Sequence, residues 1–293
     1  MAIDFKALGA KAAAEGADQT KSVAGGGGDF TPPAAGPGTA RFVGYVELGK
    51  QKGTFKGVPT IKEKVILVFE LVGKRHPPRE LEDGTKLPVR ITIEENYSLN
   101  EKANLFKLFQ RMNYKQDAQH FAQLLGEGYK VEVVHDKWTG KDGKERTDAV
   151  LRNAGGYTIA PPRKEDEDSE TGWVDIAVPP ALSTPRCFIW QQADLEQWGS
   201  LFIEGEYPER KNDKGEVTAP AKSKNVFQNR IKQATNFIGS PIHELLVTNG
   251  HGVDIPALDE QDDDEGPAAQ AAVPPKPKSS TTPPSDDALG GIV

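Results

Sequence analysis

Two polar stretches of this 293-residue chain combine basic and aromatic side chains. Residues 49–57 contain three lysines and a phenylalanine, and residues 137–146 contain a tryptophan among four basic side chains. Basic side chains neutralise phosphates, and flat rings stack on unpaired bases. The two stretches therefore predict a surface that binds single-stranded nucleic acid. The candidate contacts are Lys50, Lys52, Phe55, Lys56, Lys137, Trp138, Lys141, Lys144 and Arg146, with Tyr45 and Tyr157 as further stacking candidates.

The chain offers weaker patterns for catalysis or metal binding. Its five histidines show no HExxH or other metal-binding spacing, and no serine lies in a GxSxG motif. Residues 44–51 match a Walker A phosphate loop, except that Gln51 stands where Ser or Thr must hold magnesium. The acidic run at residues 262–265 lacks the ligand order of a calcium loop. We therefore expect no enzyme activity, no metal and no cofactor.

The spacing of apolar residues predicts the strands that position these stretches. Residues 65–72 form a continuous apolar run, which is typical of a strand buried on both faces. Residues 89–93 alternate between polar and branched apolar side chains, as a half-buried strand does. A further strand is expected at residues 42–48, where Gly44 indicates a bulge.

A helix and two more strands complete the pattern. Ser98 and Glu101 match a capping box, so a helix is expected to begin there. Strand character returns at residues 129–135 and within residues 149–159. Three strands, a helix and two strands is the element order of the OB-fold, a Greek-key barrel that binds oligonucleotides. We therefore expect a mainly β protein of the α+β class: an OB-fold-like five-stranded barrel with a helix between strands 3 and 4.

This barrel would bring the two basic stretches to one groove. In an OB barrel, the first and last connecting loops and the face of strands 2–3 form the oligonucleotide site. The predicted strands place residues 49–57 and 137–146 in those two loops. Arg90 and Tyr97, in and just after the third strand, join the candidate DNA contacts.

Composition and charge divide the chain into four parts. Residues 1–38 are expected to be a flexible arm, residues 39–160 the barrel, residues 161–250 appended strands and helices, and residues 251–293 a disordered acidic tail. Residues 39–160 have 21 basic and 16 acidic side chains, whereas residues 254–293 have 2 basic and 9 acidic ones. A basic groove and an acidic tail on one chain can compete for each other and for nucleic acid.

Three segments, residues 98–104, 120–126 and 156–163, are similar to sequences of bacteriophage proteins. With the basic barrel and acidic tail, the chain resembles the single-stranded DNA-binding proteins of tailed phages. The resemblance implies sequence-independent binding in DNA replication or recombination, with a tail that regulates DNA occupancy or docks partner proteins. Such tails often end in an aromatic residue, but residues 289–293 contain none. The acidic residues expected to act in the tail are Asp262, Asp263, Asp264, Glu265, Asp286 and Asp287.

The remaining expectations concern location and alternatives. The single Cys187 fits a reducing compartment, and no apolar run reaches the length of a signal-peptide core or a membrane span. We expect a protein of the host-cell cytoplasm with no membrane partner. The sequence leaves open whether the protein forms a homo-oligomer. The main alternative is a phage structural or assembly protein that uses the barrel for protein contacts, and a nucleic-acid enzyme is a weaker one.

Overall fold

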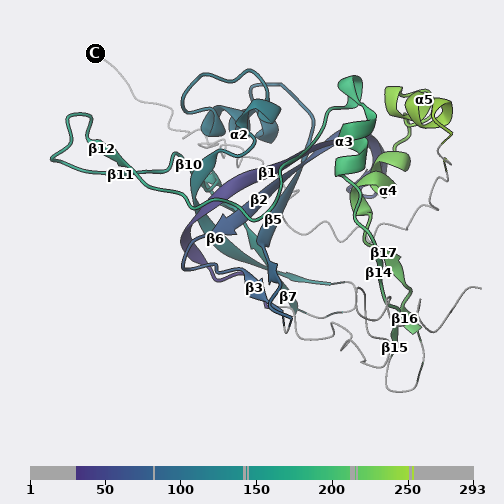
Figure 1. Cartoon of the computed structure of the whole chain (residues 1–293), viewed down its shortest axis with the longest axis horizontal. Coiled ribbons are helices and arrows are strands. Elements are labelled where there is room, and N and C mark those ends of the chain that lie inside the picture. Colours follow the sequence, from purple (N-terminus) through teal and green to yellow (C-terminus); the bar gives the residue numbers. More distant parts are fainter. Residues whose placement is uncertain are drawn as a thin grey trace, which may run out of the picture.

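The computed structural model describes residues 31–81, 83–140, 143, 145–211, 215, 217–250 and 253. The protein is mainly β, with one large sheet and few helices (Figure 1). The strands of the sheet are β1 (Gly36–Phe55), β2 (Val58–Val72), β5 (Val89–Asn96), β6 (Gly128–Thr139), β7 (Glu145–Val150), β10 (Ile159–Ala160) and β13 (Arg186–Phe188).

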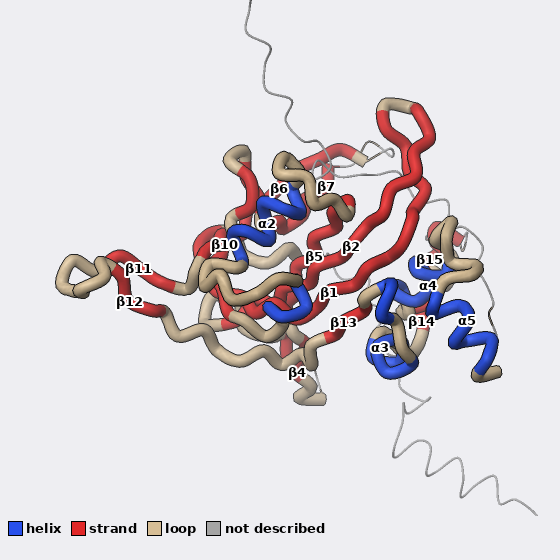
Figure 2. Tube along the Cα trace, turned by 90° about the horizontal axis from the view of Figure 1, so that it is seen from above, coloured by secondary structure: helices blue, strands red, loops and turns tan. Residues whose placement is uncertain are grey.

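Helices and short ribbons surround this sheet (Figure 2). The helices are α2 (Asn104–Met112), α3 (Leu195–Ser200), α4 (Val226–Lys232) and α5 (Pro241–Thr248), with 3-10 turns η1 (Phe121–Leu124) and η2 (Trp190–Gln192). The ribbons are β3–β4 (Arg79–Glu80, Lys86–Leu87), β8–β9 (Arg152–Asn153, Gly156–Tyr157), β11–β12 (Arg163–Glu165, Trp173–Asp175), β14–β17 (Glu206–Tyr207, Lys222–Ser223) and β15–β16 (Arg210–Lys211, Val217–Ala219).

The strand order of the sheet is β10-β6-β1-β2-β5, with β7 added to β6 and β13 added to β1. Every pair is antiparallel except β1–β13. The two ends of the sheet approach each other, because β5 lies close to β7. No hydrogen-bonded ladder joins these two strands in the described part of the chain. The α+β class, with a large and mostly antiparallel sheet, is therefore confirmed.

β1 changes its neighbour halfway along its length. Residues 36–41 pair with β6, and residues 44–46 then pair with β13. The register of the β1–β2 ladder shifts between Phe42 and Gly44, and a Cβ at Gly44 would lie 2.9 Å from the Val68 side chain. The bulge expected at Gly44 is therefore present, and glycine allows β2 to approach closely there.

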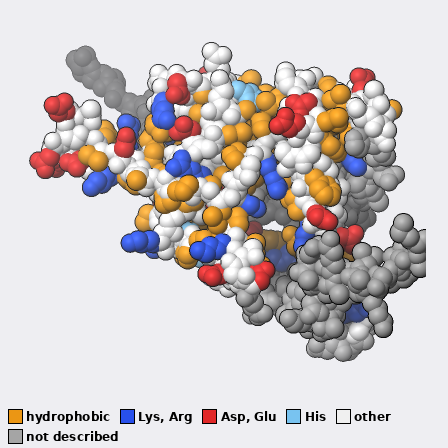
Figure 3. Space-filling model, viewed as in Figure 1, with side chains coloured by type: hydrophobic (Ala, Val, Ile, Leu, Met, Phe, Trp, Pro, Cys, Tyr) orange, Lys and Arg blue, Asp and Glu red, His pale blue; other side chains and the backbone are white. Residues whose placement is uncertain are grey.

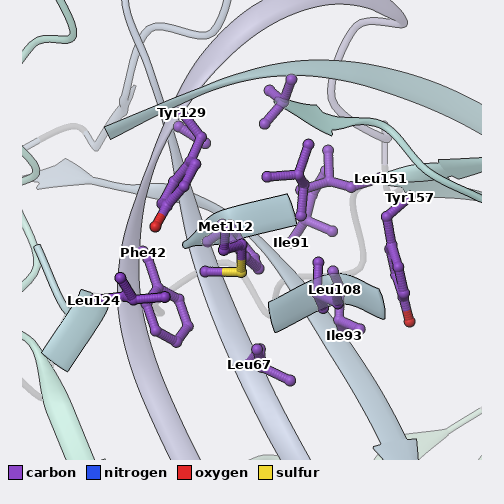
Figure 4. Close-up of a cluster of buried hydrophobic side chains, with 14 of the residues drawn as sticks. Phe42, Leu67, Ile91, Ile93, Leu108, Met112, Leu124, Tyr129, Leu151 and Tyr157 are labelled. Carbon is purple, nitrogen blue, oxygen red and sulfur yellow. The ribbon is translucent and has the colours of Figure 1, made fainter. Parts of the chain in front are cut away.

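One face of the sheet packs against α2 in the larger hydrophobic core. Figure 4 shows Leu108 and Met112 of α2 among Phe42, Leu67 and Ile93 of the strands. The alternation expected in β5 is confirmed, because residues 91, 93 and 95 are buried and their neighbours are exposed.

α2 begins later than the sequence predicts, so the expected capping box is wrong. Ser98 Oγ accepts a hydrogen bond from the Asn100 amide at 3.4 Å, and the helix begins only at Asn104. The Asn100 side chain in turn accepts from the Lys102 amide at 2.9 Å. These local bonds from side chain to backbone form a turn that competes with the first helical turn.

The opposite face of β1 and β2 is buried by the C-terminal part of the protein. Val46 and Ile66 contribute to a second core whose other members include Trp190, Trp198 and Phe237. All residues from 65 to 72 are buried, so the expectation of a strand buried on both faces is confirmed. Helices α3, α4 and α5 therefore form a layer over the outer side of the sheet (Figure 1).

Candidate nucleic-acid interface

The first basic stretch is a β-hairpin rather than a loop. β1 continues to Phe55 and β2 begins at Val58, so the turn contains only Lys56 and Gly57. Both turn residues have positive φ, 50° and 78°, as a two-residue type I′ hairpin requires. The strand expected at residues 42–48 therefore continues seven residues beyond its predicted end. Cross-strand pairing maintains the strand through a polar sequence that by itself resembles a loop.

The hairpin presents Phe55 beside two lysines at its tip. The Phe55 ring is 55% exposed, and the Nζ atoms of Lys56 and Lys62 lie 5.5 and 5.6 Å from the ring centroid. Lys50 and Lys52 are exposed on the opposite face of the hairpin. A base stacked on Phe55 would have cations within reach of its phosphates. Lys62 was not among the sequence-predicted contacts, although its position two residues before Lys64 in a strand could have indicated it.

The base of this hairpin is fixed to the C-terminal layer. The Lys50 amide donates to Asn236 Oδ1 at 2.7 Å, and the Thr235 amide donates to the Lys50 carbonyl at 2.8 Å. Gln51 is buried and donates to the Arg230 carbonyl at 2.9 Å. The two bonds to the Lys50 backbone satisfy the edge of β1 where neither β6 nor β13 pairs with it, and the Gln51 side chain adds a link to α4. The hairpin therefore extends from an anchored base, as Figure 2 shows at the free end of β1 and β2.

The second basic stretch forms the β6–β7 hairpin. Trp138 is half-buried, and its Nε1 donates to Asp148 Oδ2 at 2.7 Å. The Arg146 guanidinium lies 5.0 Å from the Trp138 ring centroid, and Lys137 is exposed. The structure therefore brings Trp138 and Arg146 together, with the indole held in a defined orientation, whereas Lys137 pairs with Thr147 and lies on the other face of the hairpin. Lys141 and Lys144 lie outside the described residues.

Arg90 binds protein groups rather than facing an open groove. One row of cross-strand partners consists of Arg41, Glu70 and Arg90. Each of these three side chains forms hydrogen bonds with the segment before β13. Arg90 donates from Nε and Nη2 to Ser183 Oγ at 2.9 and 2.7 Å. Buried Glu70 accepts from the amides of Leu182 and Ser183 at 2.6 and 2.9 Å. Arg90 therefore helps to hold this segment on the sheet.

The other aromatic candidates are less accessible than Phe55. Tyr97 is half-buried beside the base of the first hairpin. Its pKa is raised mainly by burial, and the negative charges of Glu47 and Glu63 add to this effect. Tyr45 and Tyr157 are buried in the larger core, so the expectation that they stack on bases is wrong. Both tyrosines lie in short, largely apolar strand segments, a context that fits a core side chain equally well.

The face of strands β2 and β5, which an OB groove would use, is partly covered. Ile66 and Val68 of β2 are buried in the second core. On β5, Glu94 forms ion pairs with Arg230 of α4 and, at 2.8 Å, with Lys64. The expected contacts therefore form two separate hairpin clusters.

The rest of the described surface gives little indication of a catalytic site. Figure 3 shows Lys and Arg side chains interspersed with acidic ones over one face of the protein. No group of three metal-binding side chains occurs in the described residues. Burial is the main cause that raises the pKa of the Cys187 thiol to about 11, and the negative charges of Glu47 and Asp194 add to it. The thiol therefore stays protonated and weakly nucleophilic. Among the described helices, none is long and apolar enough to span a membrane.

The acidic residues at positions 262–265, 286 and 287 lie outside the described residues. Comparison of the chain with protein-family models, curated proteins and solved structures found no match.

Proposed function

We propose that this protein binds single-stranded DNA with little sequence preference and acts in phage DNA replication or recombination. The observation that carries the proposal is the exposed Phe55 ring with Lys56 and Lys62 beside it at the tip of a rigid hairpin. Stacking on an aromatic ring tolerates any base, because every base has a π face. The second cluster, Trp138 with Arg146 beside its ring, again combines an aromatic side chain with a cation, and Lys137 is exposed on the other face of the same hairpin.

The arrangement of the sheet supports an OB-like barrel. Its five long strands follow the spatial order β5-β2-β1-β6-β7, and the close approach of β5 to β7 brings the two ends together. α2 lies between the third and fourth of these strands in sequence and packs against β5 and β10. In an OB-fold the first and last hairpins border the oligonucleotide site. Those are the two hairpins that present Phe55 and Trp138.

The covered outer face of β2 moves the proposed DNA path toward the hairpins. The C-terminal layer and the Glu94–Arg230 pair occupy part of the face that strands 2–3 offer in an open OB groove. Phosphates would therefore contact Lys50, Lys52, Lys56 and Lys62 on one hairpin, and Lys137 and Arg146 on the other. Lys141 and Lys144, in the chain between β6 and β7, belong to the same proposal.

The acidic tail completes the proposal. Residues 254–293 have 9 acidic and 2 basic side chains, so they can compete with DNA for the lysines of the hairpins. The tail would regulate DNA occupancy or dock replication and recombination proteins in the host-cell cytoplasm. A chain that ends at Val253 is then expected to bind DNA more tightly than the full chain. An unchanged affinity would contradict competition by the tail without affecting the DNA site.

Fluorescence anisotropy of a labelled oligo-dT tests the DNA site directly. The full chain is expected to bind it, with log affinity falling against log salt by about 0.7 per phosphate neutralised. Phe55→Ala is expected to weaken binding by roughly tenfold, because stacking on an aromatic ring contributes about 1–3 kcal/mol per base. Phe202→Ala is the matched control, since Phe202 is 54% exposed after α3 and lies in neither hairpin.

Each outcome separates the proposal from its rivals. Equal losses in the two phenylalanine variants would move the DNA site away from the β1–β2 hairpin. No binding by the full chain or by the chain that ends at Val253 would overturn the proposal. Defined oligomers without DNA affinity would then favour a role in phage assembly.

A further inference from the structure

The tip of the β1–β2 hairpin has exposed apolar side chains on both of its faces. Phe55 and Val58 are direct cross-strand partners, so they share one face. Ile61 is the partner of Lys52 and lies on the other face. Val58 is 62% exposed and Ile61 is 59% exposed. Phe55 and Val58 therefore form one exposed apolar pair, and Ile61 adds an exposed apolar side chain to the other face of the same tip.

Stacking of single-stranded bases does not account for Val58 and Ile61. These side chains have no π face, and one stacked base on Phe55 would leave the opposite face of the hairpin untouched. Cations occur on both faces, since Lys62 shares the Phe55 face while Lys50 and Lys52 share the Ile61 face, where exposed Glu63 is the cross-strand partner of Lys50 and offsets one of these charges. A polyanion on each side of the hairpin would match this distribution.

The hairpin has a continuous ladder and an anchored base, as a wedge between two such strands would need. Its ladder is continuous from the Lys50–Glu63 pair to the Phe55–Val58 pair, and the turn has only two residues. Its base is held by the bonds from Thr235 and Asn236 to the Lys50 backbone. A force on the tip would therefore be transmitted to the C-terminal layer.

We propose that the β1–β2 hairpin is a wedge that enters junctions between single-stranded and double-stranded DNA. One separated strand would lie along each face, with its phosphates near the lysines of that face. Val58 and Ile61 would contact the terminal base pair, as apolar wedges do when they enter a base step. This inference rests on the proposed DNA-binding function and adds a substrate, the forked junction, that single-strand affinity alone does not require.

A forked duplex with 2-aminopurine at the last base pair tests the wedge. The full chain is expected to increase the fluorescence of the reporter and to bind the fork more tightly than an oligo-dT of the same length as one arm. The test variant combines Val58→Thr with Ile61→Thr, because threonine keeps the β-branch that suits a strand. Ile238→Thr is the control, since Ile238 is 63% exposed and lies outside the hairpin.

The double variant is expected to retain its affinity for oligo-dT while its preference for the fork falls by roughly fivefold, since two apolar contacts are lost. Its reporter signal should also fall, whereas the Ile238→Thr control should behave as the parent does. Opening that came only from capture of spontaneously frayed strands would persist in the double variant, and that result would overturn the wedge.

The test also separates failure of the wedge from failure of the proposed function. A parent protein that binds oligo-dT but never changes the reporter signal would overturn the wedge alone. A parent that binds neither oligo-dT nor the fork would overturn both.

Discussion

Arg230 of α4 and Glu94 of β5 form an ion pair that joins the C-terminal layer to the sheet. The second guanidinium nitrogen of Arg230 lies 3.3 Å from the other carboxylate oxygen, so the contact is bidentate. Lys64 of β2 reaches the same carboxylate at 2.8 Å. The pair thus covers part of the outer face of β5 and, through Lys64, attaches the base of the β1–β2 hairpin to α4.

This ion pair predicts a specific loss of stability in acid. Burial by itself raises the pKa of Glu94, but the hydrogen bond and charge of Arg230, followed by those of Lys64, outweigh it and lower the pKa. Because the folded-state pKa is lowered, the stabilisation is present above the ordinary carboxyl pKa of 4.5 and is lost as pH falls through the folded-state value. Glu94→Gln should therefore cost about 1 kcal/mol or less at pH 7, as partly exposed pairs do.

Urea unfolding of the parent and Glu94→Gln from neutral to acid pH checks this prediction. The difference between the two proteins should shrink below pH 4.5. Glu132→Gln, which changes an exposed carboxylate on β6, is the control. A constant difference at all pH values would show that the variant acts through packing rather than charge.

Gly49 is expected to be the glycine least tolerant of substitution along β1. Its φ is +71°, and a Cβ there would lie 2.3 Å from the Trp190 ring. Gly49→Ala should cost about 2–4 kcal/mol, because backbone strain and overpacking both contribute. Gly57→Ala is the matched control, since Gly57 has φ +78° but nothing within 4 Å of the added atom. Urea unfolding should show a loss of only about 1 kcal/mol for the control, and equal losses would contradict close packing of η2 on β1.

Lys52 and Arg90 should affect different properties although both are basic and exposed. Lys52→Gln should reduce the slope of log affinity against log salt by about 0.7 and leave unfolding unchanged, because it removes one phosphate contact. Arg90→Gln should instead cost about 1 kcal/mol of stability, because it loses both bonds to Ser183. Oligo-dT titrations and urea unfolding of both variants check this. A reduced salt slope without a loss of stability in Arg90→Gln would return the DNA path to the face of β5.

Cys187 should react slowly with alkylating reagents in the folded protein. Its pKa is raised from 9.0 to about 11, so at pH 8 its thiolate should be about 100-fold rarer than that of an unburied thiol. Mass spectrometry after iodoacetamide treatment gives a clear result, because the chain has one cysteine. The rate should increase with pH and on unfolding in urea. Rapid alkylation of the folded protein at neutral pH would indicate an activated thiol and would favour an enzyme.

Local sequence patterns were sufficient to predict much of the central sheet. The apolar run at residues 65–72 and the alternation at residues 89–93 identify β2 and β5, because burial on one or two faces directly selects side chains along a strand. Gly44 marked the bulge for a similarly local reason. The combination of lysines with Phe55 or Trp138 was also visible in short stretches, so the candidate residues of the two hairpins could be named from the sequence.

The structure differs from the sequence-based prediction at residues whose hydrogen-bond or pairing partners lie elsewhere in the chain. The pairing of residues 50–55 with residues 58–63 extends the hairpin beyond its expected length and places Val58 and Ile61 on opposite faces. The interaction of Arg90 with Ser183 spans 93 residues, and that of Glu94 with Arg230 spans 136 residues. A residue's own sequence neighbourhood shows whether it is basic or aromatic, whereas the availability of its side chain depends on which remote groups the fold places beside it. The sequence by itself thus determined the strands and the chemistry of the hairpins, and the tertiary contacts decided which surface stays open.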